Sequence, residues 1–142
     1  MKRKIFPRIS TQLTAVVTNQ DGDSLKITAL DTTQYGFSFQ CSTLQRNSLT
    51  PGGSFIYNGR PMALHVLLDL PFPDESLQIQ SRCHVAFSRR IANDKCEIGI
   101  RYGEFEGDGY AYLIKFLETM AKSASIAVMP GQPSISPVQL FL

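Results

Sequence analysis

Two apolar stretches of the chain are separated by the sequence Asp31-Thr32-Thr33-Gln34-Tyr35-Gly36. Every second residue is apolar from Leu25 to Ala29 and again from Phe37 to Cys41, a period that is typical of strands with one buried face. Gly36 can adopt positive φ or allow a close approach to the backbone, and Asp31 and Thr33 can bond backbone amides. Residues 31–36 are therefore predicted to form a turn or bulge between two strands.

The same alternation recurs along most of the chain and predicts further strands. They are joined by turn sequences at 19–23, at Asn58-Gly59 and at Asn93-Asp94. The segment 43–53 is polar and contains Pro and Gly, so we expect a loop there. On the strand 77–87, odd-numbered residues up to Phe87 are expected to share one face. The predicted strands are 13–18, 24–30, 37–41, 54–57, 62–69, 77–87 and 96–102.

The periodicity changes from two to that of a helix at Gly107. Asp108 is a plausible N-cap for an amphipathic helix over 109–122. Its apolar face is expected to pack on the strands. Because closure removes exposed strand edges, we predict a mainly β fold, a small antiparallel (split) β-barrel of six to seven strands with this one C-terminal amphipathic α-helix. The expected face comprises Tyr110, Leu113, Ile114, Leu117, Met120 and Ala121.

Three segments are expected from composition. Residues 1–10 form a basic arm, residues 11–122 the barrel with its helix, and residues 123–142 a C-terminal tail rich in Ser and Pro. The tail ends in the apolar segment Val138–Leu142, which forms a patch if exposed. We expect this segment to contact a downstream partner protein, a second copy of the chain in a homodimer, or the barrel.

Composition narrows the function classes. The chain has 142 residues and a formal net charge of +2, which favours one domain and argues against a general nucleic-acid or membrane-surface binder. Exposed Phe and Tyr residues are not interleaved with Lys and Arg along one predicted strand face, so a nucleic-acid-binding barrel is the weakest hypothesis. We find no apolar run of membrane-spanning length. The cysteines, read as buried free thiols in a reducing compartment, favour a cytoplasmic protein; they are Cys41, Cys83 and Cys96.

Catalytic and metal-binding patterns find little support in the sequence. The two histidines, His65 and His84, each lie within a strand pattern, and no nucleophile or carboxylate stands at a diagnostic spacing from either. Spacings of the Cys-x-x-Cys or His-x-x-x-His kind do not occur. We therefore expect neither an enzyme nor a metal site.

The basic arm suggests an anionic ligand that carries guanine. The planar fork of arginine matches the O6/N7 edge of guanine, and a carboxylate accepts from its N–H groups. The arm Arg3-Lys4-Ile5-Phe6-Pro7-Arg8, followed by a hairpin and residues 31–36, resembles the PilZ domain, whose signatures are R-x-x-x-R and [D/N]-x-S-x-x-G. The stretches 85–90 and 99–102 are also similar to that family. The resemblance covers about residues 2–122.

This resemblance implies a small β-barrel receptor for the bacterial second messenger cyclic di-GMP that signals to partner proteins. It implies that Arg8, with Lys4 or Arg3, holds guanine edges and phosphates. It further implies that Asp31 and Thr33 hold the other side of the base and that Gly36 permits close approach. Lys4 stands where the family has the first arginine, and Thr33 replaces the serine. A PilZ-like adaptor that does not bind cyclic di-GMP is the second hypothesis.

Overall fold

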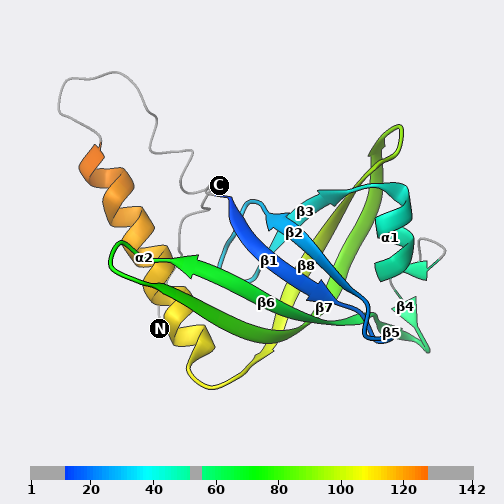
Figure 1. Ribbon diagram of the computed structural model, residues 1–142, viewed down its shortest axis with the longest axis horizontal. Coiled ribbons are helices and arrows are strands. Elements are labelled where there is room, and N and C mark those ends of the chain that lie inside the picture. Colours follow the sequence, from blue (N-terminus) through cyan, green and yellow to red (C-terminus); the bar gives the residue numbers. More distant parts are fainter. Residues whose placement is uncertain (1–11, 52–55, 128–142) are drawn as a thin grey trace, which may run out of the picture.

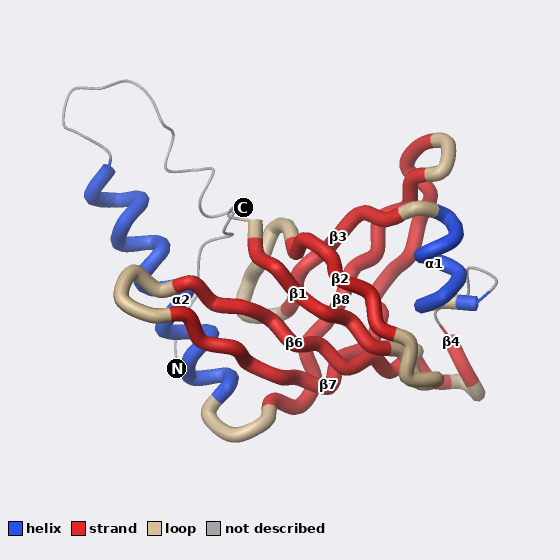
Figure 2. The backbone as a smooth tube through the Cα atoms, viewed as in Figure 1, coloured by secondary structure: helices blue, strands red, loops and turns tan. Residues whose placement is uncertain are grey.

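The computed structural model describes residues 12–51 and 56–127. The predicted arm, with Arg3, Lys4 and Arg8, and the apolar segment Val138–Leu142 lie outside the described residues. The described chain is mainly β, with two helices (Figures 1 and 2). The strands are β1 (Leu13–Thr18), β2 (Ser24–Ala29), β3 (Gly36–Cys41), β4 (Ile56–Tyr57), β5 (Arg60–Pro61), β6 (Ala63–Pro71), β7 (Ser76–Ala92) and β8 (Lys95–Phe105); the helices are α1 (Thr43–Leu49) and α2 (Gly109–Ala127).

Six of these strands form one antiparallel sheet that curves into a half-barrel. Their order is β2-β1-β6-β7-β8-β3, and β4 and β5 make a separate two-stranded ribbon. The edge strands β2 and β3 are consecutive in sequence, and an isolated antiparallel bridge between Leu30 and Ser38 joins them. The short segment between β2 and β3 thus brings the two edges of the sheet together, and the predicted fold class is confirmed.

The interior of the half-barrel is filled by the alternating apolar residues that the sequence identified. Val17, Ala29 and Phe39 are completely buried, in line with burial of one strand face at every second residue. The three cysteines are buried free thiols, as predicted. The turns also occur where the sequence placed them, and Asn58, Gly59 and Asp94 adopt the positive φ that such turns require.

Helix α2 packs against the end of the sheet where β6 and β7 are joined (Figure 1). Leu113, Phe116 and Leu117 are fully buried, and the ring of Phe116 meets that of Phe72 edge-on, with 5.6 Å between ring centroids. The predicted face was wrong in two respects: it omitted Phe116, and it included Tyr110, which is 45% exposed with its ring beside that of Phe105. The helix also extends beyond the predicted end at 122.

The predicted loop at 43–53 was also wrong, because it contains helix α1. Ser42 and Gln45 form a capping box. The Ser42 hydroxyl accepts a hydrogen bond from the backbone N–H of Gln45, and the side-chain oxygen of Gln45 accepts one from the backbone N–H of Ser42. Leu49 anchors the helix in the core, and the side chain of Asn19 donates to the Ser48 carbonyl. These contacts hold a short polar segment in a helical conformation.

A β-bulge changes the face of one predicted core residue. The pairing of β7 with β8 shifts between Val85 and Phe87, so Ala86 is the extra residue and the alternation restarts one residue late. Phe87 is consequently turned outward and is 39% exposed, whereas the hydroxyl of Ser88 is buried. The expectation that Phe87 shares the buried face of Val85 was therefore wrong.

Candidate functional site

The turn between β2 and β3 is organised by the hydroxyl group of Thr33. This oxygen accepts hydrogen bonds from the backbone amides of Tyr35, at 3.1 Å, and Gly36, at 3.3 Å, and it lies 3.3 Å from the Gly36 carbonyl oxygen. The Thr33 amide also donates to the Gly36 carbonyl, and Asp31 has a φ of 50°. Residues 31–36 therefore form the predicted turn, and the hydroxyl at position 33 stabilises it by bonding backbone amides of the turn.

Gly36 is required by the neighbouring strand. It lies opposite Arg101 in the pairing of β3 with β8, and a Cβ atom at this position would overlap the carbonyl oxygen of Ile100. That oxygen belongs to the backbone and cannot move aside without disrupting the sheet. The backbone that comes close to Gly36 is thus that of the neighbouring strand β8.

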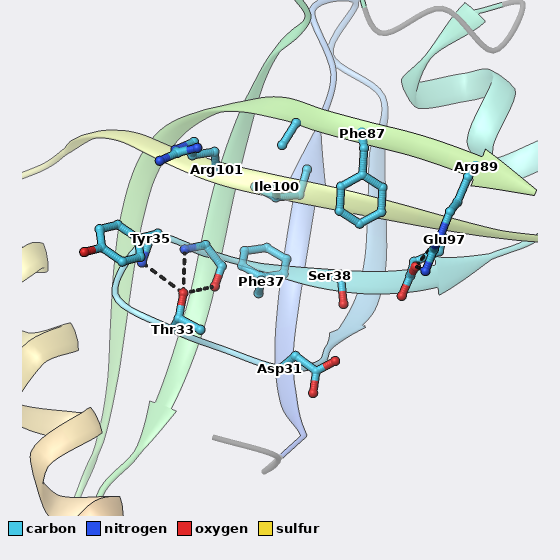
Figure 3. Close-up of a pocket in the computed structure, with 12 residues that line it drawn as sticks. Asp31, Thr33, Tyr35, Phe37, Ser38, Phe87, Arg89, Glu97, Ile100 and Arg101 are labelled. Atoms are coloured by element: carbon cyan, nitrogen blue, oxygen red, sulfur yellow. Dashed lines mark hydrogen bonds and ion pairs between the residues drawn. The ribbon is translucent and has the colours of Figure 1, made fainter. Parts of the chain in front are cut away.

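A cavity of about 480 Å³ lies beside this turn, on the outer face of the sheet (Figure 3). Asp31, Thr33 and Gly36, the site residues predicted from the sequence within the described part, all line it. The opposite side is formed by β7 and β8, so residues separated by about 50 to 70 positions in the sequence meet there. The contributors from these two strands are Ala86, Phe87, Arg89, Glu97, Ile100 and Arg101.

The strands β7 and β8 bring two arginines and one aromatic ring to the cavity. Arg89 forms an ion pair with Glu97, with its Nε 2.8 Å from a carboxylate oxygen, and its guanidinium lies 5.7 Å from the centroid of the Phe87 ring. Arg101 is exposed, and no ion-pair partner for it is found in the described part of the chain. Beside the carboxylate-bearing turn, the cavity therefore offers one guanidinium held by an ion pair and one without such a partner in the described part, a combination that suits a ligand with both N–H donors and an anionic group.

Sequence reasoning missed this second wall of the cavity as a site. Arg89 and Arg101 lie in the stretches 85–90 and 99–102, which carry part of the family resemblance, but the residues had no assigned role. A sequence signal existed for Arg101, because the apolar alternation of 37–41 and of 96–102 leaves Gly36 and Arg101 out of the apolar face of each strand. What the sequence could not provide was the pairing of β3 with β8.

Burial raises the pKa of three ionisable groups in the interior. Burial raises the pKa of the Cys41 thiol to about 11, and the facing Cys96 thiol adds to this rise. Burial likewise raises the pKa of Cys83 and of the Tyr102 phenol. These groups stay protonated at neutral pH, which suits a structural role.

His65 is exposed on the sheet, with its Nε2 3.0 Å from the Gln80 side-chain oxygen. Within residues 12–51 and 56–127, no three His, Cys, Asp or Glu side chains gather as metal ligands. No helix in this described part of the chain combines the length and apolar character needed to cross a membrane.

Solved structures that resemble this fold include PilZ-domain proteins, at low sequence identity. The inhibitor of motility of Bacillus subtilis, MotI/DgrA, matches with a TM-score of 0.62 at 14% identity, over 90% of this chain and 55% of that chain. MrkH of K. pneumonia matches with a TM-score of 0.54 at 11% identity, over 89% of this chain and 53% of that chain.

These likenesses show the fold alone, since the sequence identities are low. The chain spans only about half the length of MotI/DgrA and of MrkH. The PilZ domain of CeSA from a cellulose-synthesizing bacterium matches at a TM-score of 0.47 and 16% identity, over 80% of this chain and 96% of that chain. No family model and no curated protein matches the sequence.

Proposed function

We propose that this protein is a non-catalytic receptor for cyclic di-GMP that acts in the cytoplasm and changes its contacts with a partner protein when the ligand binds. The observation that carries this proposal is the cavity of about 480 Å³ in which the 31–36 turn faces the arginines of β7 and β8. Such volumes are typical of small-molecule sites. The PilZ-like fold supports the choice of ligand.

The chemistry of the cavity fits one half of this ligand. The carboxylate of Asp31 can accept from the N–H groups of guanine, and guanidinium groups can bond either the O6/N7 edge of the base or a phosphate. In this proposal Arg8, with Lys4 or Arg3, supplies further cationic contacts from the N-terminal arm. Thr33 and Gly36 contribute by holding the turn in shape.

Calorimetric titration with cyclic di-GMP tests the proposal directly. We expect a dissociation constant in the micromolar range for the wild type, and a loss of roughly tenfold or more in affinity for Arg8→Ala and for Asp31→Ala, since one bidentate base contact is worth about 1 to 3 kcal/mol. Asp74→Ala and Arg60→Ala, which alter exposed residues that do not line the cavity, serve as matched controls. Absence of heat at high protein concentration contradicts the receptor function.

The register of the arm can be tested with a second pair of variants. In an extended arm, Lys4 and Arg8 project to the same side and Arg3 to the other, and lysine lacks the two-pronged donor of arginine. Lys4→Arg should therefore tighten binding by roughly tenfold. If this variant is neutral and Arg3→Ala abolishes binding, Arg3 rather than Lys4 is the partner of Arg8.

A ligand-free adaptor is the second candidate, and one observation favours it. Thr33 and Gly36 are both accounted for by contacts within the fold, so their presence does not require a ligand. An adaptor would bind its partner protein with equal affinity in the presence and absence of cyclic di-GMP. Partner capture by immobilised protein, with and without the ligand, distinguishes the two functions.

A further inference from the structure

The bulge at Ala86 produces an arrangement that conflicts with the local sequence pattern. Without the extra residue, Phe87 would face the core beside Val85, and Ser88 would face solvent. With it, an aromatic ring is exposed, and the Ser88 hydroxyl is buried with no hydrogen-bond partner in the described part of the chain. Each change costs free energy. Conflicts of this kind between local pattern and fold are expected at functional sites.

The exposed ring of Phe87 lies over the neighbouring strand. Phe87 is opposite Gly99 in the pairing of β7 with β8, and a Cβ atom at position 99 would overlap the ring. Gly99 is in turn opposite Ser38 on β3. One face of the ring therefore covers the backbone of β8, as Figure 3 shows, and the cavity beside the 31–36 turn is open to the ring.

Cationic groups flank this ring on both sides along the strands. Arg89 is two residues further along β7 and is held by Glu97. Arg101 is two residues from Gly99 along β8, in the cross-strand row that contains Gly36. The expectation that exposed Phe and Tyr residues are not interleaved with Lys and Arg along one strand face is thus wrong at this place, because the bulge brings Phe87 to the outer face of the sheet. An aromatic ring between two guanidinium groups suits a purine base with its phosphate.

We propose that Phe87 is the stacking platform for one guanine base of the ligand and that Arg101 bonds the edge of that base or its phosphate. This inference rests on the proposed receptor function and adds to it a second wall of the site. Base stacking on aromatic side chains is favourable for every base, whereas an arginine fork favours guanine. The bulge, together with the buried Ser88 hydroxyl that accompanies it, is the feature that presents this ring to the cavity.

The test compares Phe87→Leu and Arg101→Gln with the wild type in calorimetric titrations of cyclic di-GMP. Each variant is expected to weaken binding by roughly tenfold. Phe87→Tyr keeps the ring and should bind like the wild type. Tyr112→Leu, which removes an equally exposed ring on α2 outside the cavity, is the matched control and should leave the affinity unchanged.

Proton NMR of the ligand provides a readout that a merely structural role would not affect. Stacking on the Phe87 ring should shift the guanine H8 signal upfield in the complex, and the shift should vanish with Phe87→Leu and persist with Phe87→Tyr. Circular dichroism checks that each variant is folded. If Phe87→Leu does not fold, Phe87→Met, which keeps a long apolar side chain without a ring, takes its place.

The outcomes separate this inference from the proposed function. If the wild type binds, Asp31→Ala abolishes binding, and Phe87→Leu binds normally with an upfield H8 signal, the stacking role is wrong and the receptor function stands. If the wild type does not bind cyclic di-GMP, both fail. If a single-stranded oligouridylate binds more tightly than cyclic di-GMP and depends on Phe87, the face is a nucleic-acid site, and the inference is overturned.

Discussion

Gly36 and Gly99 lie on neighbouring strands beside the same cavity, and each leaves room for a different neighbour. A side chain at Gly36 would meet the backbone oxygen of Ile100, whereas a side chain at Gly99 would meet the ring of Phe87. The first obstacle is fixed by the sheet, but the second can rotate into solvent. The glycine of the predicted signature therefore serves strand pairing, and the glycine without a predicted role determines where an exposed ring lies.

The largest effect is expected for Gly36→Ala. The new methyl group must push β3 away from β8, and overpacking against backbone should lower the free energy of unfolding by about 3 kcal/mol or more. Urea denaturation measures this loss. Gly59→Ala, which adds a methyl group in open space at a φ of 77°, should cost only about 1 to 2 kcal/mol. Equal losses for the two variants would contradict the steric argument.

Alkaline pH tests the same strand pair from its other end, where Cys41 faces Cys96. The pKa of Cys41 is raised from 9.0 to about 11 in the folded protein. As pH rises above 9, the thiol therefore loses its proton in the unfolded chain before it does so in the folded protein. The contribution of Cys41 to the free energy of unfolding is fully present below pH 9 and falls by about 2 to 3 kcal/mol as pH approaches 11.

The measurement is urea denaturation at about pH 8 and about pH 10.5, within the titration range of the thiol. Because tyrosines and lysines also titrate there, the wild type is compared with Cys41→Val, whose stability should depend less on pH. A constant difference between the two proteins at both pH values would show that Cys41 does not contribute.

A smaller effect is expected at Thr33, whose hydroxyl bonds two backbone amides of the turn. Thr33→Val keeps the shape of the side chain but leaves both amides without this acceptor, so the free energy of unfolding should fall by about 1 to 2 kcal/mol. Thr33→Ser keeps the hydroxyl and should change stability by no more than about 0.5 kcal/mol. The midpoint of chemical denaturation measures both changes. If Thr33→Val does not lower the free energy of unfolding, water replaces the hydroxyl as the acceptor for the two amides.

The smallest change in stability is expected for Gly99→Ala, at less than about 1 kcal/mol, because the Phe87 ring can swing outward. Cyclic di-GMP affinity should nevertheless fall, because the ring no longer lies over β8. Calorimetry and denaturation on the same sample measure the two effects. A loss of stability as large as that of Gly36→Ala would show that the ring is a fixed part of the core.

The sequence predicted the elements whose signals are local. Alternation identified the strand faces of Ile27 and Phe39, and turn residues located the connections at 31–36 and Asn58-Gly59. Helix α1 was missed although Ser42 and Gln45 match the capping box, because a polar segment with Pro and Gly was read as a loop. The burial of Phe116 was missed because the helical period shows that one face is apolar but does not fix which residues lie at its centre.

The candidate site was predictable only on one side. Asp31, Thr33 and Gly36 were identified together because they are neighbours in the chain. Phe87 and Arg101 reach the cavity through a bulge and a strand pairing, and neither is encoded by a short-range pattern. A bulge in particular shifts every later residue to the opposite face, so alternation alone assigned Phe87 to the core.

The order of strands in the sheet also has a consequence for how the chain folds. The hairpins β1–β2, β6–β7 and β7–β8 join neighbours in sequence, but β3 pairs with β8 across 55 to 65 positions of the chain. Closing such long loops slows folding to the millisecond-to-second range typical of non-local β topologies. Because this pairing brings the 31–36 turn to Phe87 and Arg101, the ability to bind a ligand should appear only once this non-local pairing has formed.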